Sequence, residues 1–261
     1  MTLPASGQIT LTQVNVELGE ISTQTINMGS AAVRDLFGIA SGVIAMSDGY
    51  GKSSEITVTL KSSAFNDTGA VTLPGSLSNG DMLLFGTYSQ QPETFASPPS
   101  GWTALFTFGT DGDSDGVAVL WAKIVDGTGT ESGSITCFGS NRADGSFIAV
   151  LESGISSFGT LVDFNSQSTG GTPADQVVNA STLGTLPFLV FGMYAASNAM
   201  PIADAGFSGA TADFTVGDVT ADNVYFKGKF YAEGSSPADI TVSMVDVNKD
   251  NCLFSGIIPL T

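Results

Sequence analysis

The chain has 261 residues, of which 42% are hydrophobic and 13% are charged, and it carries 25 acidic and 8 basic residues but no histidine. A net charge of −17 repels phosphate backbones and anionic lipid surfaces, which argues against nucleic-acid and membrane binding. Without histidine the chain can form neither a Ser-His-Asp triad nor a Cys-His pair, and a zinc site would have too few ligands. We therefore expect no catalytic residues and no bound cofactor, and the protein is predicted not to be an enzyme.

The N-terminal region, residues 1–53, differs in pattern from the rest of the chain. Alternation at Ile9, Leu11 and Gln13 predicts a strand, whereas Ser30 followed by AAVRDLFG predicts a capped helix that ends at Gly38. ASGQITLTQ (5–13) returns as ASGVIAMSD (40–48), so two Ser-Gly-x-Ile strands are expected to flank the helix. A unit of this size holds little core of its own, which predicts that it docks on a partner. The residues expected to anchor that partner are Ile9, Leu11, Val33, Leu36, Phe37, Ile44 and Tyr50.

From residue 54 onward nearly every segment is an apolar run followed by a turn rich in Gly, Asp, Asn, Ser or Pro. This pattern is typical of a β-sandwich. The predicted strands are ITVTLKS, DMLLFGTYS, VAVLWAKIV, SITCF, FIAVLES, FLVFGMYAA, VYFKGKFYA, ITVSMV and CLFSGIIPL. Cys137 and Cys252 lie in two of these runs and are expected to be buried free thiols, although a disulfide between them stays open.

An internal repeat divides the body, residues 54–261, into two halves of about 56–160 and 170–261. Phe85 in LLFGTYS matches Phe191 in LVFGMYA, and Lys123 matches Lys229 at the same spacing. Three further pairs follow in the same order: Gly101-Trp102 with Gly206-Phe207, SITCF with DITVSM, and FIAVLESG with LFSGIIPL. The halves could form two sandwiches or close into one double sheet, with a seam near residues 165–175. The expected fold is mainly β, a small α+β unit followed by a jelly-roll-like sandwich built from two pseudo-repeats.

Acidic residues crowd one turn of the first half, DGDSDG. Asp111, Asp113 and Asp115 match the first half of a calcium loop, because closely spaced carboxylates repel unless a cation relieves them. The position that should carry a bidentate Glu is Ala122, so a helix–loop–helix site is excluded. An acidic hairpin turn without metal is the alternative, and VDVNKDN (245–251) has the same alternative.

The longest irregular insertion of the first half is QQPETFASPPSG, residues 90–101. If the protein has a receptor-binding loop, Pro98, Pro99 and Trp102 are the residues we expect in it. Trp102 could stack on a sugar ring or a partner, or it could start a strand and close the end of the sandwich.

Two sets of motifs resemble known phage proteins. SGQITLTQVNVELG, TINMGSAAVRDLFG and SGVIAMSDGYGKS resemble a module at the start of many tailed-phage virion proteins, often tail-fibre or minor structural proteins. NGDMLLFG, PPSGWTAL and AVLWAKIVDGTGTESGSITC are similar to a second phage and prophage element, although AGFSGAT replaces the Trp loop in the second half. The resemblance implies a virion component with no catalytic residues to carry over.

What the resemblance implies can be stated as a set of expectations. The protein is expected in the virion, in the tail rather than the head, after assembly in the host cytoplasm. Residues 1–53 would bind another virion protein, and the body would bind a host-surface glycan or protein through many weak contacts. A homo-oligomer is expected, with a trimer as the arrangement considered, because edge strands need protection. A capsid decoration or head-fibre protein is the main alternative, and a polysaccharide depolymerase and a free lectin-like module are the others.

Overall fold

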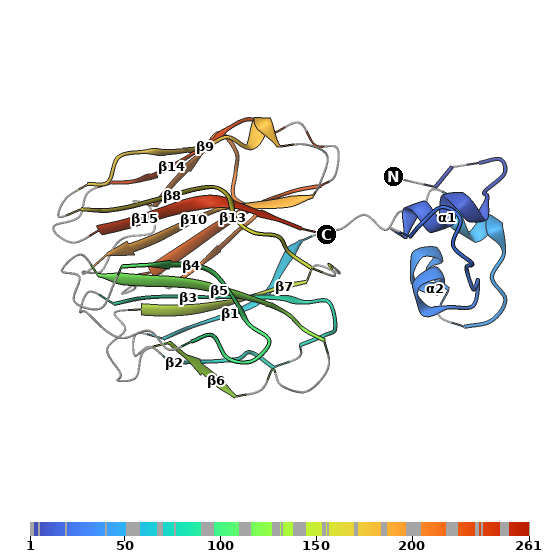
Figure 1. The fold of residues 1–261 in the computed structure, drawn as a ribbon, viewed down its shortest axis with the longest axis horizontal. Helices are drawn as coiled ribbons and strands as arrows, with labels where there is room; N and C mark the ends of the chain where they lie inside the picture. Colours follow the sequence, from blue (N-terminus) through green and yellow to red (C-terminus); the bar gives the residue numbers. More distant parts are fainter. Residues whose placement is uncertain are drawn as a thin grey trace. The chain divides into compact units, whose positions relative to one another are not determined.

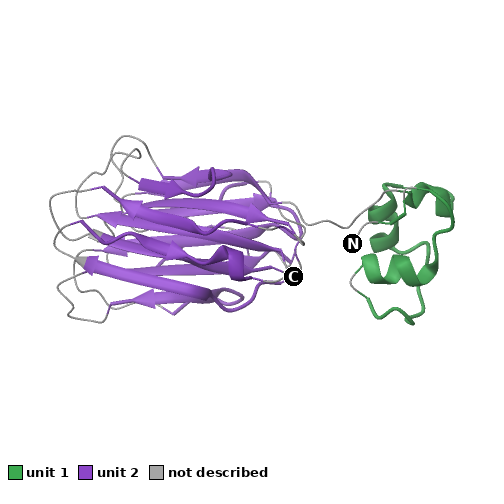
Figure 2. Cartoon of the chain, turned by 90° about the horizontal axis from the view of Figure 1, so that it is seen from above, with its two compact units in different colours: residues 1–55 green, residues 56–261 purple. Residues whose placement is uncertain are grey.

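The computed structural model describes residues 3–4, 6–18, 20–39, 41–50, 58–66, 70–75, 77–89, 97–109, 116–126, 131, 133–137, 145–152, 155, 157–169, 172–183, 187–196, 205–217, 224–232, 235, 237–245 and 251–260. The chain divides into two compact units, Met1–Glu55 and Ile56–Thr261 (Figure 2). The first unit contains short helices, and the second is built of strands (Figure 1).

In the described residues of the first unit the structure has three short helices, joined by turns. They are α1 (Leu11–Glu17), α2 (Ala31–Phe37) and the 3-10 helix η1 (Met46–Gly49). The prediction for α2 is confirmed at both ends: Ser30 accepts a hydrogen bond from the Val33 N–H, and Gly38 ends the helix with a φ of 72°. The side chain of Asn15 is buried and donates to the Gln24 carbonyl (2.8 Å), which ties α1 to the following loop.

The strand predicted at Ile9, Leu11 and Gln13 is wrong, because Leu11 and Gln13 lie in helix α1 and Ile9 directly precedes its N-cap residue Thr10. Thr10 Oγ1 accepts a hydrogen bond from the Gln13 N–H (3.2 Å), and Gln13 Oε1 accepts one from the Thr10 N–H (2.8 Å). These reciprocal bonds satisfy two backbone donors that would otherwise be unpaired at a helix start. The capping hydrogen bonds therefore favour a helix here, although the short alternation of apolar residues predicts a strand.

The repeated Ala-Ser-Gly-x-Ile motif precedes a helix in both of its copies. Gly7 and Gly42 both have a φ of +95°, a left-handed conformation that favours glycine. Three residues further on, Thr10 and Ala45 are the N-cap residues of α1 and η1. The Ala45 N–H donates to the Asp48 carboxylate (2.8 Å), the same kind of contact that starts α1. The motif thus specifies a turn and a helix start twice, and the two strands expected from it do not form.

Fifteen strands form in the described part of the second unit. In chain order they are β1 (Thr59–Asn66), β2 (Ala70–Thr72), β3 (Met82–Ser89), β4 (Thr103–Phe108), β5 (Val117–Ile124), β6 (Ser134–Thr136), β7 (Gly145–Glu152), β8 (Val162–Thr169), β9 (Gln176–Val178), β10 (Phe188–Ala196), β11 (Ala205–Ser208), β12 (Phe214–Val216), β13 (Val224–Tyr231), β14 (Ile240–Met244) and β15 (Asn251–Pro259). A short 3-10 helix, η2 (Ala180–Thr182), follows β9. Each of the predicted apolar runs overlaps one of these strands, so the mainly β class is confirmed.

The strands stack as four layers, which Figure 1 shows edge-on. Two five-stranded antiparallel sheets, β1-β7-β3-β5-β4 and β8-β15-β10-β13-β12, form the two middle layers. A two-stranded sheet, β2-β6, covers the outer face of the first, and a three-stranded sheet, β9-β14-β11, covers the outer face of the second. The second unit is thus a sandwich in which each half contributes one large and one small sheet.

Each half pairs its strands in the nested order of a jelly roll. In the first half β1 pairs with β7, β2 with β6 and β3 with β5. In the second half β8 pairs with β15, β9 with β14 and β10 with β13. The chain of each half therefore folds like one long hairpin whose successive strand pairs alternate between the two sheets. This order bears out the jelly-roll-like fold expected from the sequence.

Clusters of buried apolar side chains hold the layers together. Between the two large sheets, Phe147 lies 5.4 Å from Phe226 and Phe106 lies 4.9 Å from Phe254, measured between ring centroids. Under the β2-β6 sheet Trp121 packs with other apolar side chains, and a third cluster lies under the β9-β14-β11 sheet. Each fully buried large side chain contributes roughly 1.5–3 kcal/mol, so these layers supply most of the stability of the unit. Cys137 and Cys252 are buried thiols that form no disulfide with each other, and Cys252 Sγ donates to Ser168 Oγ (3.3 Å).

The register of the two sheets corrects part of the predicted repeat. Leu83 pairs with Lys123, whereas its predicted counterpart Leu189 pairs with Phe230 and Lys229 pairs with Val190, so the predicted matches of the two strand pairs cannot both hold. Two residues from each lysine, Trp121 and Tyr231 pack in the outer-face clusters, so the lysine match is the one that keeps the same face. Because Val190 is the counterpart of Leu83, the counterpart of Phe85 is Gly192 and not Phe191. A shift of one residue turns a side chain to the other face of a strand. Phe85 accordingly packs on the outer face of its sheet, whereas Phe191 packs between the two large sheets.

Two other details of the predicted repeat also change. Gly101 and Trp102 lead into β4, which pairs with β5, whereas Gly206 and Phe207 lie in β11, which pairs with β14 in the outer sheet. These two pairs of residues are therefore not equivalent. The first part of the expected seam at residues 165–175 belongs to β8, which pairs with β15. The second half thus begins at β8, before the expected seam.

Candidate functional site

The residues predicted to anchor a partner lie in two different environments of the first unit. Ile9, Val33, Leu36 and Phe37 are buried in the core of the unit itself, and Ile44 packs against that core. These side chains stabilise the unit and present little surface to a partner. Leu11, which is 50% exposed, and Tyr50, which is 40% exposed, are the two that remain accessible. Tyr50 also donates a hydrogen bond to the Gly7 carbonyl (2.5 Å), which joins the first copy of the repeated motif to the turn that follows the second copy.

Three exposed apolar residues of the first unit were missed by the sequence analysis. Val43 is 93% exposed and Ile21 is 71% exposed, and Val16 lies on the exposed side of α1. With Leu11 and Tyr50 they make five of the nine large apolar side chains that are exposed in the described part of the chain. The unit holds about one fifth of the residues, so its surface is enriched in apolar side chains. In the sequence these residues look like those of the core, because no clear amphipathic period separates the two groups.

The predicted receptor loop is described from residue 97 onward and forms a tight turn. The Trp102 N–H donates to the Pro99 carbonyl (3.0 Å), and Gly101 has a φ of +82°, as the third residue of a type II turn requires. Pro99 is exposed, and Pro98 is half-buried. Trp102 is also half-buried, since it packs against the apolar clusters on the outer face of the first large sheet. The Trp102 side chain is therefore partly in the core and partly at the surface.

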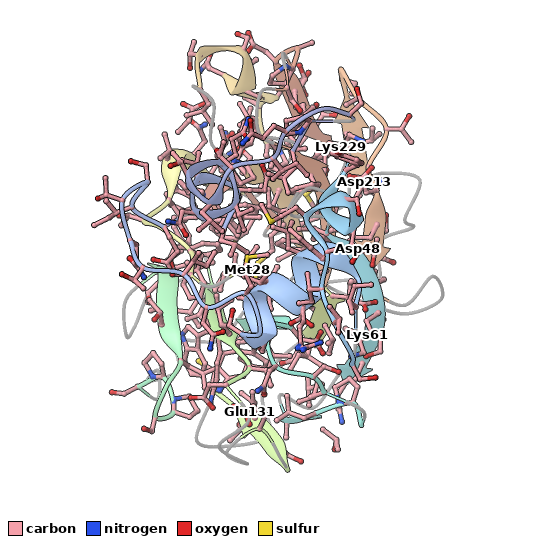
Figure 3. All side chains as sticks on the ribbon, turned by 90° about the vertical axis from the view of Figure 1, so that its right-hand side faces the viewer. Met28, Asp48, Lys61, Glu131, Asp213 and Lys229 are labelled. Carbon is pink, nitrogen blue, oxygen red and sulfur yellow. The ribbon has the colours of Figure 1, made fainter. Side chains whose placement is uncertain are left out.

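A buried ion pair lies beneath this turn. Lys123 Nζ is 3.1 Å from Glu131 Oε1, and the two side chains are 4% and 6% exposed. A side-chain carbon on Gly101 would lie only 3.1 Å from Lys123 Nζ, so glycine allows the turn to pass close over the lysine. In the second half the equivalent Lys229 pairs with Asp213 (2.6 Å) near the surface, and both residues are labelled in Figure 3.

The strand β13 carries two groups whose pKa values are shifted by their surroundings. Burial lowers the pKa of Lys227, whose ammonium group donates to the Ala205 carbonyl. Burial raises the pKa of the Tyr231 hydroxyl, whereas Lys229 lowers it and Asp213 raises it. Both groups lie in the second half, away from the predicted loop, and neither has the geometry of a proton donor facing a cavity.

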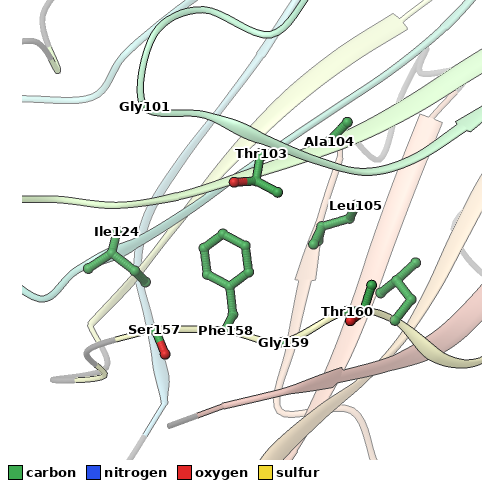
Figure 4. Close-up of a pocket in the computed structure, with 10 residues that line it drawn as sticks. Gly101, Thr103, Ala104, Leu105, Ile124, Ser157, Phe158, Gly159 and Thr160 are labelled. Atoms are coloured by element: carbon green, nitrogen blue, oxygen red, sulfur yellow. The ribbon is translucent and has the colours of Figure 1, made fainter.

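A pocket of about 520 Å³ opens beside the Gly101 turn (Figure 4). One wall comes from the edge strand β4 and the adjoining end of β5, and the other comes from the segment that connects the two halves. The lining residues are Gly101, Thr103, Ala104, Leu105, Ile124, Ser157, Phe158, Gly159, Thr160 and Leu161. None of these ten residues was predicted as a site residue. No sequence motif identifies residues 157–161 as part of a site. They come close to β4 only because the two halves pack together.

The calcium site proposed at Asp111, Asp113 and Asp115 lies outside the described residues, as does most of the acidic segment 245–251. Elsewhere, no three Asp, Glu, Cys or His side chains of the described ranges gather closely enough to hold a metal ion. The described helices have at most seven residues, and none is long and apolar enough to cross a membrane. No protein-family model, curated protein or solved structure matches this chain.

Proposed function

We propose that the chain is a structural protein of a bacteriophage virion, a component of the tail fibre or tail tip that helps the particle attach to its host. The observation that carries the proposal is the division into a small helical unit and a large strand-built unit, each with a core of its own. Such a division suits a protein that is held by one part and makes contacts through the other. The motifs that resemble tailed-phage proteins lie in both units and support the same role.

The first unit is the part proposed to bind another virion protein. Its buried residues already form a closed core, so a partner would contact the exposed apolar set of Leu11, Val16, Ile21, Val43 and Tyr50. Removing exposed apolar surface from water stabilises a complex by roughly 25 cal/mol per Å² before the costs of association. The anchoring role therefore moves from the predicted core residues to this exposed set.

The second unit is the part proposed to face the host. Its large sheets end in the edge strands β1, β4, β8 and β12, and unpaired strand edges favour association with further chains unless they are protected. A homo-oligomer, for which a trimer is the arrangement proposed, would display several copies of any weak binding site. Linked weak sites raise the overall affinity by about 10²- to 10⁴-fold when they engage one surface together.

Deleting residues 1–53 tests the proposal most directly. The remaining body should stay folded and soluble but should be missing from purified particles, as measured by mass spectrometry of the virions. Two point variants, Ile21→Ser and Val43→Ser, should reduce incorporation without unfolding the first unit, because both side chains are exposed. Val177→Ser, at an exposed apolar residue of the body, is the matched control and should be incorporated normally. Normal incorporation of the deletion variant would contradict the anchoring role.

The position of the protein in the particle tests the second part of the proposal. A labelled copy seen by cryo-electron microscopy is expected at the tail. A label on the capsid shell would overturn the assignment to the tail in favour of a decoration protein.

A further inference from the structure

We propose that the pocket between β4 and residues 157–161 binds one uncharged hexopyranose ring. The sugar ring is proposed to belong to a neutral glycan of the host surface, and this part of the inference rests on the proposed attachment function. Its physical basis is the pocket itself, whose volume of about 520 Å³ falls within the roughly 300–1,000 Å³ common for small-molecule sites.

Hydrogen bonds and a strand bridge hold both walls of the pocket in place. The Gly159 N–H donates to the Pro259 carbonyl (2.9 Å), and Phe158 forms an isolated bridge with Leu260, so the connecting segment is held against the end of β15. On the opposite side the Trp102–Pro99 hydrogen bond holds the turn that ends at Gly101. A pocket formed between restrained walls loses little conformational entropy when a ligand enters.

The side chains in the pocket match the two faces of a sugar ring. Phe158 lies in the middle of the pocket, with Thr103 on one side and Thr160 on the other (Figure 4). The C–H face of a pyranose packs on an aromatic or aliphatic surface, which Phe158 and Leu105 supply, whereas its hydroxyl groups need donors and acceptors at the rim. Thr103 and Thr160 are exposed and provide such hydroxyl groups.

The backbone of β4 adds polar groups along the same wall. The register of β4 with β5 is interrupted between Ala104 and Phe106, and the extra residue of this bulge is Leu105. The inserted residue of a bulge is left out of the strand pairing, so its peptide groups can turn toward a ligand. Because β4 is also an edge strand, the side of its backbone away from β5 is not paired within the sheet.

Charge selects a neutral ring over an acidic one. None of the ten described residues that line the pocket is charged. Lys123, which lies beside Gly101, forms an ion pair with Glu131. The chain as a whole carries a net charge of −17, which repels sialic acids, uronic acids and sugar phosphates. A single neutral ring with so few contacts is expected to bind with a dissociation constant on the order of 1 mM.

Saturation-transfer difference NMR on the full chain tests this inference. The probes are D-glucose, D-galactose, D-mannose and N-acetyl-D-glucosamine, with N-acetylneuraminic acid and glucose 6-phosphate as acidic counterparts. At least one neutral sugar should receive saturation from the protein, and the two acidic sugars should not. Phe158→Leu keeps an apolar side chain but removes the ring, so it should abolish the signal. Thr160→Val removes one hydroxyl and should weaken binding about 3- to 10-fold.

Two further variants separate loss of the site from loss of the fold. Ala104→Phe fills the pocket from an exposed position and should block binding, and Thr107→Val changes an exposed threonine of β4 outside the pocket and should bind like the wild type. Absence of binding by every neutral probe, or equal binding by Ala104→Phe and the wild type, overturns the inference. Incorporation of the protein into particles is measured separately, so failure of the sugar site can be told apart from failure of the virion role.

Discussion

Lys123 and Lys229 occupy the same position in the two jelly rolls, yet one forms a buried ion pair and the other an exposed one. Lys123 is bound to Glu131 with both side chains almost fully buried, whereas Lys229 and Asp213 are 26% and 33% exposed. Comparing the two lysines therefore shows how burial changes the contribution of an ion pair to the free energy of unfolding within a single fold. The buried pair also supports the turn at Gly101, which borders the proposed sugar pocket.

Removing the two lysines is predicted to have unequal effects on stability. Lys123→Met leaves a buried carboxylate without its cation and should lower the free energy of unfolding by about 3–5 kcal/mol. Lys229→Met, at an exposed pair, should lower it by about 1 kcal/mol or less, including the loss of its contact with the Tyr231 ring. Urea denaturation of both variants gives the comparison. Equal effects, or a larger effect at Lys229, would contradict the role assigned to burial.

A double variant serves as the control for the buried pair. Lys123→Met combined with Glu131→Leu removes both charges, and apolar replacements of a buried ion pair are often neutral for stability. The double variant should therefore recover most of the stability that Lys123→Met loses. If it does not, the loss comes from packing of the lysine stem and not from the unpaired charge.

Replacement of Gly86 is predicted to destabilise the second unit, because the Phe147 ring packs directly against this glycine between the large sheets. A side-chain carbon on Gly86 would lie 2.3 Å from the ring of Phe147, which is too close for any real contact. Phe147 is fully buried, so it can move aside only by disturbing the core. Gly86→Ala should lower the free energy of unfolding by about 1–3 kcal/mol, as overpacking of a core commonly does. Gly75→Ala, where the added carbon meets nothing within 4 Å, should leave thermal stability unchanged.

The sandwich could be predicted from the sequence because its strands are strongly apolar, but the register of the repeat could not. Every residue of β3 and of β10 is buried, since each large sheet is covered on both faces. A strand buried on both sides has no alternation of apolar and polar residues, and only that alternation shows which face a residue takes. The similarity between LLFGTYS and LVFGMYA therefore aligned Phe85 with Phe191, although the two side chains face different layers.

The candidate sites were harder to predict than the fold because they depend on which surfaces stay exposed. In the first unit, Val33 and Phe37 are buried while Val43 is exposed, and all three are ordinary apolar residues in the sequence. The pocket is formed by β4 together with Phe158 and its neighbours, which are far apart in the chain. Only the turn at Gly101 could be anticipated, because Pro, Gly and Trp in close succession favour a tight turn next to a strand.

The capping residue of α1 is predicted to matter for the first unit alone. Thr10→Ala removes the hydroxyl that accepts the Gln13 N–H, and loss of an N-cap costs about 1 kcal/mol. Hydrogen exchange should show faster exchange of the amides in residues 11–18 and unchanged exchange in the strands of the body. Thr12→Ala, at an exposed position inside the same helix, is the control and should leave exchange equal or slower, since alanine favours helices. Faster exchange throughout the body would show that the two cores are coupled.

Asp239 is predicted to make stability depend on acid pH. Hydrogen bonds from the side chain and the backbone N–H of Ser181 lower the pKa of this exposed carboxyl group below its ordinary value of 3.8. A carboxyl group whose pKa is lower in the folded state stabilises the fold above its unfolded pKa, and this stabilisation disappears as the pH falls through the folded pKa. Asp239→Asn should therefore be slightly less stable than the wild type at pH 7, and the difference should vanish in strong acid. Thermal unfolding at a series of pH values measures this, and Ser181→Ala should lose part of the same difference, because its backbone N–H still donates. A constant difference between Asp239→Asn and the wild type at every pH would show that the charge of the carboxylate plays no part.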